Sequence, residues 1–199
     1  MSWFQKSYEQ YTDEQLMKKL ASGNQLAFDE LYARYANVLL NYFHRMLWKD
    51  REKAEDFVHD LFLKIIQNPN SFDTSRTFKT WIYSVANNMC KNEYKKQQVR
   101  AGSNLPLHEY TTVEGKETDA LIKTHFSFFN EAFNKQLYDL DEKHREVFIM
   151  RHLEGLSIKE ISSILGVNEG TIKSRIFYAV KQLSNGLTAF NLKNKTNHG

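Results

Sequence analysis

The chain has 199 residues, a formal net charge of +3 and 41% hydrophobic residues, which suits one domain or two small ones with a packed core. A net charge this small does not by itself indicate a nucleic-acid binder, and the single cysteine, Cys90, excludes a disulfide framework. The N-terminus has no signal-peptide core and no apolar run is long enough to span a bilayer, so we expect a cytoplasmic protein without direct membrane insertion.

The first part of the chain predicts three helices in succession. Thr12 and Gln15 form a capping-box pattern at the start of the first helix, because each side chain can bond the backbone N–H of the other residue. Apolar and aromatic residues then recur every three or four positions over residues 27–47, and again over residues 52–67. This spacing gives each helix one apolar face.

A loop and a fourth helix follow before the periodicity is lost. Residues 68–77 are rich in asparagine and serine, which favour turns, and helical patterning runs from Phe78 to about residue 98. The next stretch holds two glycines and a proline, and helical patterning resumes near residue 118. We therefore predict an all-α protein of two small helical domains, at residues 12–98 and 136–187, with a linker that includes a helical segment at 99–135 and a polar tail at 188–199.

Residues 155–176 predict two short helices joined by a tight turn. Ser157 and Glu160 form a capping-box pattern for the first helix, and Gly166 stands where the residue after a helix often needs a left-handed backbone. Asn168 can cap the second helix. Helices joined in this way are typical of a helix-turn-helix, whose second helix lies in the major groove of DNA.

The second helix of this pair has two chemically different sides. A helical wheel predicts a buried side formed by Ile172, Ile176, Ala179, Val180 and Leu183. No acidic residue follows Glu169 in the sequence. The outer side of the helix has basic residues at its edges, which would meet phosphates, and a middle that would meet bases. A helical hairpin packed in a core or at a protein interface is the alternative. The outer side and its edges comprise Gly170, Lys173, Ser174, Arg175, Phe177, Tyr178 and Lys181.

The third predicted helix has a polar side opposite its apolar side, lined by Glu55, Asp56, His59 and Asp60. Glu55 and His59 are four residues apart and could both bind a metal, but no second helix offers further ligands, so we expect no metal site. The remaining interpretation from these residues alone is a solvated acidic surface.

Residues 71–95 combine aromatic and basic side chains, including Phe72, Phe78 and Trp81 near Lys91 and Lys95. Aromatic rings beside cations can stack on unpaired bases and hold the backbone of a melted strand. Large aromatic residues are also typical of a core, which is the alternative for Phe78 and Trp81.

These motifs, in this order, resemble the sigma-70 family. Residues 140–187 resemble region 4, residues 54–65 resemble region 2.2, and residues 78–96 resemble regions 2.3 and 2.4. Two domains joined only by a linker are the layout of the extracytoplasmic-function (ECF) group of small sigma factors. The resemblance implies a subunit that directs bacterial core RNA polymerase to promoter DNA, contacts the β′ coiled coil and the β flap of the polymerase, and is held inactive by an anti-sigma factor.

The resemblance also implies the residues of each site. The polymerase-docking residues would be Glu55, Asp56, His59, Asp60 and Phe62. The −10 promoter element would be opened by Ser71, Phe72, Arg76, Trp81, Asn87, Asn88, Lys91, Asn92 and Lys95. With the basic edges of the last helix included, the −35 element would meet Lys173, Ser174, Arg175, Phe177, Tyr178 and Lys181. Relatives often carry arginine at the position of Tyr178, and tyrosine cannot form arginine's bidentate pair with guanine.

Two other classes of protein are alternatives. A helix-turn-helix regulator that does not bind polymerase would need neither the acidic side at residues 55–60 nor the aromatic and basic strip at residues 71–95. An enzyme would need a site that the sequence lacks, since it has no Gly-rich phosphate loop, no paired cysteine ligands and no nucleophile–base set. We therefore expect no catalytic residue, no cofactor and no small-molecule substrate.

Overall fold

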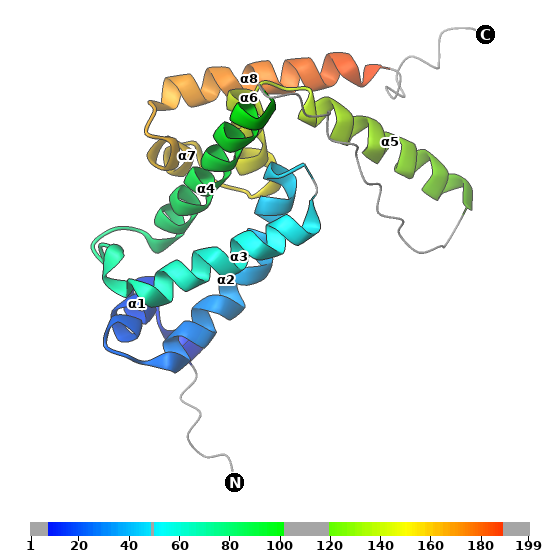
Figure 1. The fold of residues 1–199 in the computed structure, drawn as a ribbon. Helices are drawn as coiled ribbons and strands as arrows, with labels where there is room; N and C mark the ends of the chain where they lie inside the picture. Colours follow the sequence, from blue (N-terminus) through cyan, green and yellow to red (C-terminus); the bar gives the residue numbers. More distant parts are fainter. Residues whose placement is uncertain (1–7, 49, 102–119, 189–199) are drawn as a thin grey trace, which may run out of the picture. The chain divides into compact units, whose positions relative to one another are not determined.

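The structure is a computed structural model that describes residues 8–48, 50–101 and 120–188, and all regular secondary structure in these residues is helical (Figure 1). This confirms the predicted all-α fold class. The chain divides into two compact units at about residue 110. None of the described helices is long and apolar enough to cross a membrane.

The first unit is built from four helices and two short 3-10 turns in its described part. These are η1 (Tyr8–Gln10), α1 (Asp13–Ala21), α2 (Gln25–Met46), α3 (Arg51–Gln67), η2 (Pro69–Ser71) and α4 (Phe78–Ala101). The long helices α2 and α3 lie side by side (Figure 1). The predicted capping box at the start of α1 is confirmed, because Thr12 and Gln15 each bond the other's backbone N–H.

The core of the first unit lies between α2, α3 and α4. Phe43 of α2 is fully buried and its ring lies 5.4 Å from that of Phe57 on α3. Tyr42, also on α2, is fully buried with its ring 5.3 Å from Tyr83 of α4. Burial of one large apolar side chain contributes about 1.5–3 kcal/mol. These buried faces decide which residues of α3 and α4 point outward.

Charged side chains fix the N-terminal part of the first unit against α2 and α4. The guanidinium of Arg34 lies 2.7 Å from Asp13 and 2.8 Å from Glu30, and it also donates to backbone carbonyls of the N-terminal segment. The carboxylate of Glu14 accepts the backbone N–H of Phe78 at 2.9 Å. Burial alone would raise the pKa of Glu14, but this hydrogen bond and others hold it below its ordinary value. Glu14 therefore anchors the first residue of α4.

The described part of the second unit is also helical. It comprises α5 (Ala120–Tyr138), α6 (Glu142–Phe148), the π-helical turn η3 (Ile149–Leu153), α7 (Ile158–Leu165) and α8 (Glu169–Gly186). Its core includes Val147 and Ile149, together with Ile161 of α7 and Ile172 of α8, all fully buried. Helix α5 continues across residue 135, where the sequence predicts the start of the second domain.

The helix-turn-helix predicted from the caps is present in α7 and α8. Ser157 and Glu160 form the capping box, with the Ser157 N–H donating to the Glu160 carboxylate at 2.7 Å. Gly166 follows α7 in the left-handed region, with φ of 66°. The side chain of Asn168 accepts the backbone N–H of Thr171 at 2.8 Å and so caps α8. Local sequence signals therefore set the turn that orients α8.

Replacing Gly166 by alanine is expected to lower the free energy of unfolding of the second unit by about 1–2 kcal/mol, because an L-residue is strained in the left-handed region. No atom lies within 4 Å of the added Cβ, so the cost comes from the backbone alone. Chemical denaturation of the full chain measures the change. Gly170→Ala is the matched control, since Gly170 is helical and alanine favours a helix. If Gly166→Ala and Gly170→Ala lower the free energy of unfolding equally, backbone strain at Gly166 is not the cause.

Candidate functional sites

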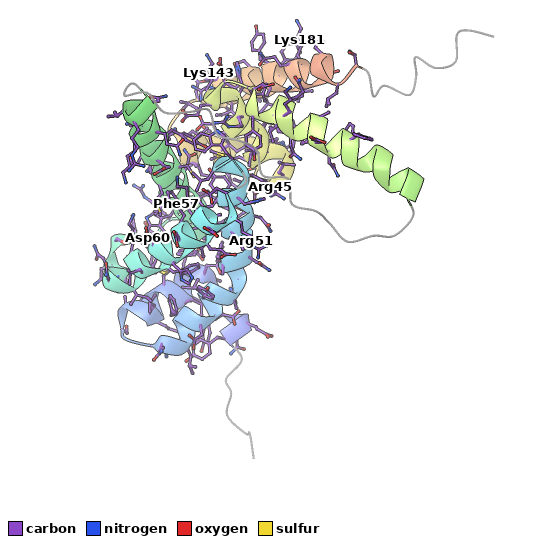
Figure 2. The ribbon with its side chains drawn as sticks, turned by 45° about the vertical axis from the view of Figure 1, so that its right-hand side comes forward. Arg45, Arg51, Phe57, Asp60, Lys143 and Lys181 are labelled. Atoms are coloured by element: carbon purple, nitrogen blue, oxygen red, sulfur yellow. The ribbon has the colours of Figure 1, made fainter. Side chains whose placement is uncertain are left out.

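The outer side of α3 carries an exposed acidic surface. Glu55, Asp56, His59 and Asp60 are all solvent-exposed, and Asp60 is labelled on this helix in Figure 2. Arg51 bonds Glu55 at 2.9 Å, an exposed contact between successive turns that contributes little energy. In the described part of the chain, no group of three or more histidine, cysteine or acidic side chains could hold a metal ion. The outer side of α3 is therefore an exposed surface with three carboxylates and one histidine.

Phe62 does not belong to this surface. It is 2% exposed, and its ring lies 4.8 Å from Tyr32 and 5.9 Å from Phe28, both on α2. Phe62 follows Val58 by one helical turn, so it continues the buried stripe that holds α3 against α2. The expectation that Phe62 contacts the polymerase is corrected by this burial, because the side chain is a core residue beneath the acidic surface.

Apolar residues that the sequence analysis did not single out extend the acidic surface. Leu63 and Ile66 are about half exposed, and they follow His59 at helical spacing on the same side of α3. An open groove between α2 and α3 lies beside Glu55 and His59 of the same helix. The spacing of Leu63 and Ile66 relative to the buried stripe is the signal that could have identified them. The groove is lined by Tyr32, Ala33, Ala36, Asn37, Leu40, Glu55, Val58 and His59.

The loop before α4 is shaped by its own side chains. Asp73 accepts hydrogen bonds from the hydroxyl of Ser75 at 2.7 Å and from its backbone N–H at 3.0 Å. These bonds, with the charge of Arg76 at 3.4 Å, lower the pKa of Asp73 below its ordinary value. Asp73 is therefore ionised at neutral pH and keeps the turn formed. Ser71 and Arg76 lie exposed in this loop.

The aromatic residues around this loop form one cluster. Phe72 is buried, with its ring 5.3 Å from Phe78 and 5.2 Å from Trp81. Phe78 is also buried, whereas Trp81 is half-buried. The expectation that Phe72 contacts DNA is corrected by its burial in this cluster. Trp81 keeps part of its ring accessible from the same cluster.

The outer side of α4 is polar and basic. It carries Asn88, Lys91, Asn92 and Lys95, of which Lys91 is half-buried and the others are exposed. Glu93, the acid within this basic segment, is buried on another side and lies 2.7 Å from Lys53 of α3. Burial alone would raise the pKa of Glu93, but the bonds to Lys53 and Gln97 hold it below its ordinary value. The outer side of α4 therefore presents cations and amides without an acid among them.

Asn87 is not on this outer side. It is 1% exposed, and its side-chain oxygen accepts a hydrogen bond from the hydroxyl of Tyr42 at 3.1 Å. The expectation that Asn87 contacts the −10 element is corrected by this burial. Asn87 links α4 to α2 through the core.

Asn87→Ala is expected to lower the free energy of unfolding of the first unit by about 0.5–1.5 kcal/mol, because the buried hydrogen bond from the Tyr42 hydroxyl would be lost. Chemical denaturation followed by circular dichroism measures this change. Asn88→Ala is the matched control, because Asn88 is exposed and its loss leaves the core intact. A stable Asn87→Ala protein that fails to open a promoter would instead favour a direct DNA contact.

The outer side of α8 carries most of the predicted −35 residues. Lys173, Ser174, Phe177, Tyr178 and Lys181 are exposed, and Lys181 is labelled on α8 in Figure 2. No acidic residue follows Glu169 in this helix. The surface therefore joins two cations to a polar and aromatic middle, which fits a negatively charged duplex.

On α8, the edge residue Arg175 bonds a neighbouring helix, and Val180 differs from its predicted placement. Arg175 is half-buried, and its guanidinium lies 3.4 Å from the buried Glu146 of α6. It therefore holds α8 against α6 at one edge of the outer side. Val180, predicted on the buried side, is 42% exposed, because it lies at the margin of the apolar stripe where no described helix covers it. The prediction for Val180 is wrong.

Comparison with protein families matches both units to one family. A model described as Sigma-70 region 2 matches residues 31–100, and one described as Sigma-70, region 4 matches residues 131–183. Together these matches cover more than half of the chain. The region 2 match contains α3 and all but the last residue of α4, and the region 4 match contains α7 and α8 as far as residue 183.

Similar proteins cover nearly the whole chain. The ECF RNA polymerase sigma factor SigW of Bacillus subtilis is 28% identical over 80% of this chain and 88% of its own. The ECF RNA polymerase sigma-E factor of Haemophilus influenzae is 29% identical over 89% of this chain and 96% of its own.

Solved structures share the fold. CnrH, in complex with the cytosolic domain of CnrY, aligns with a TM-score of 0.65 at 25% identity over 89% of this chain and 97% of its own. The sigma factor RpoE of Bartonella quintana, in complex with the anti-sigma factor NepR, aligns with a TM-score of 0.66 at 22% identity over 81% of this chain and 96% of its own. With the matched regions and the full-length relatives taken together, the chain belongs to the sigma-70 family, in the group of ECF sigma factors.

Proposed function

We propose that this protein directs bacterial core RNA polymerase to promoters, with polymerase docking and −10 recognition in the first unit and −35 recognition in the second. The observation that carries this function is the presence of three separate surfaces. These are the acidic surface of α3, the basic outer side of α4 and the acid-free outer side of α8. A helix-turn-helix regulator acting without polymerase has a use only for the last of them.

The proposed division of labour follows the two units. Residues 12–98 would form the domain for core polymerase and the −10 element, and residues 136–187 the domain for the −35 element. Residues 99–135 would connect them across the polymerase, with residues 188–199 as a tail. The family matches at residues 31–100 and 131–183 support this assignment.

The acidic surface of α3 is proposed to bind the β′ coiled coil. Asp56 and Asp60 would attract a basic partner helix and fix its register, since charge complementarity governs encounter and specificity. Leu63 and Ile66 would supply the apolar centre that a stable interface needs. Phe62 acts beneath this surface, where it fixes α3 on α2.

The outer side of α4 is proposed to hold the melted −10 strand. Lys91 and Lys95 would contact the sugar–phosphate backbone, and Asn88 and Asn92 can bond the exposed edges of unpaired bases. Trp81 would offer a stacking surface at the start of the same helix. A base drawn out of the duplex costs a few kcal/mol of stacking, which such contacts would offset.

Control by an anti-sigma factor and contact of the second unit with the β flap complete the proposal. CnrH was solved in complex with the cytosolic domain of CnrY, which supports a protein partner for this fold. The protein would act in the cytoplasm, where core polymerase and promoters are found. It would contribute no catalytic residue and use no cofactor.

Titration of fluorescently labelled full-length protein with core RNA polymerase tests this function. The expected result is saturable binding that a second sigma factor displaces, because both would occupy the same β′ surface. Binding to promoter fragments in the absence of core, without any binding to core, would instead identify a helix-turn-helix regulator. The two outcomes separate the proposed function from its alternative.

A further inference from the structure

The joint between α6 and α8 contains an imidazole that the proposed function does not use. His144 lies on α6, and its ring centroid is 6.1 Å from that of Tyr178 on the outer side of α8. The side chain of His144 is only 15% exposed, whereas Tyr178 is 53% exposed. His144 is therefore the contact through which α6 supports an exposed ring of α8.

The imidazole of His144 is placed for its uncharged form. Its Nδ1 atom is buried and has no hydrogen-bond partner among the described residues. The carboxylate of Asp141 lies 4.0 Å from Nδ1, which is beyond hydrogen-bond distance, and is itself 69% exposed. Burial of a polar group without a partner is costly, and burial of a charge costs more. A proton on His144 would therefore disturb this joint.

The charges around His144 act in the same direction. Burial lowers the pKa of His144, and the charges of Lys143 and Arg175 lower it further. Asp141 opposes this shift. Arg175 is held in place from α8, because its guanidinium lies 3.4 Å from the buried Glu146 of α6. A protonated ring is therefore accommodated best when it turns outward to Asp141 and water, away from α8.

We propose that His144 is a positioning residue for promoter binding: its uncharged imidazole holds Tyr178 in place, and protonation in mild acid releases this contact and weakens binding to the −35 element. The inference rests on the proposed function, which brings α8 to that element. The proton and the promoter then favour different arrangements of the joint between α6 and α8. Two ligands coupled in this way change each other's affinity by about fivefold or more.

The same geometry makes the stability of the second unit depend on pH. Because the pKa of His144 in the folded chain lies below its ordinary value of 6.5, the unfolded chain takes up the proton first as the pH falls. The contribution of His144 to the free energy of unfolding is therefore complete above pH 6.5 and is lost as the pH falls through the folded-state pKa. His144→Phe, which has a ring without a titratable group, should remove this part of the pH dependence.

Promoter binding by the reconstituted holoenzyme, measured as a function of pH, tests the inference. One template carries a promoter found by run-off transcription, and the other carries the same promoter with its −35 element scrambled. The ratio of the two affinities cancels the effects of pH on core polymerase. For the full-length wild-type protein, this ratio is expected to fall about fivefold between about pH 7.5 and about pH 5.5, the range in which histidine titrates.

Variants separate positioning from general support of the fold. His144→Phe keeps a ring against Tyr178 but cannot be protonated, so its ratio should match the wild type at the higher pH and should not fall in acid. His144→Ala lacks the ring and should have a low ratio at both pH values. Circular dichroism at each pH checks that the variants are folded.

The matched control is His152→Phe. His152 belongs to the same unit, and its pKa is also lowered by burial, but its ring lies 4.8 Å from Phe148 and not against α8. His152→Phe should therefore show the full wild-type fall in the ratio. A fall that disappears in His152→Phe as well would contradict a specific role for His144.

Two further results would overturn the inference while leaving −35 recognition by α8 intact. One is an equal fall in the wild type and in His144→Phe, which would place the titrating group elsewhere. The other is a ratio that rises in acid, which would mean that protonated His144 attracts the phosphates directly. A wild-type ratio near one at the higher pH would instead count against −35 recognition, and therefore against the proposed function and the inference together.

Discussion

Asp56→Arg and Asp60→Arg, made singly, are each expected to weaken binding to core RNA polymerase by about 100-fold, because like charges set against each other in an interface cost several kcal/mol. Both side chains are exposed on the same side of α3. Neither side chain belongs to the buried stripe of α3, so the fold should be unchanged. The equilibrium titration with labelled protein measures the affinity.

The control for these variants is an equal change of charge elsewhere in the first unit. Glu9 is exposed in η1, so Glu9→Arg alters net charge by the same amount without touching α3. It should bind core as the wild type does. If Glu9→Arg and Asp56→Arg lose affinity equally, the effect comes from net charge, and the acidic surface of α3 has no special role.

Lys173→Ala combined with Lys181→Ala is expected to weaken promoter binding by the holoenzyme and to reduce its dependence on salt. Each lysine that contacts a phosphate releases about one counterion, so the slope of log affinity against log salt should fall by about 2 for the double variant. The measurement is a series of promoter titrations between about 50 and 200 mM salt. Binding to core polymerase should be unaffected.

Lys159 provides the comparison for the two lysines of α8. It is exposed on α7, the first helix of the helix-turn-helix, and lies outside the outer side of α8. Lys159→Ala should leave most of the salt dependence of promoter binding unchanged. A loss of affinity in the double variant with an unchanged slope would mean that Lys173 and Lys181 do not contact phosphates.

The local features of the fold were predictable because neighbouring residues decide them. The capping boxes at Thr12 and Ser157 and the left-handed Gly166 each depend on residues within a few positions. The same holds for the amphipathic spacing of α2 and α3, which places the acidic surface of α3 opposite its buried stripe. Helical spacing therefore located the exposed polar sides of α3 and α8.

The misplaced residues are those whose surroundings come from distant parts of the chain. Asn87 is buried because Tyr42, 45 positions earlier, offers a hydrogen bond in the core. Phe62 is buried because α2 supplies aromatic partners. Spacing along one helix cannot reveal such partners. Leu63 and Ile66 differ from these cases, because their spacing relative to the buried stripe already places them on the exposed side of α3.

Run-off transcription with bacterial core RNA polymerase, with and without this protein, tests the central claim most directly. The templates are genomic fragments from the source organism, including the region upstream of the protein's own gene. The account predicts new discrete transcripts that require the protein and disappear with Asp56→Arg but persist with Glu9→Arg. Transcripts that are the same with and without the protein, although it is folded and binds the fragments, would contradict it.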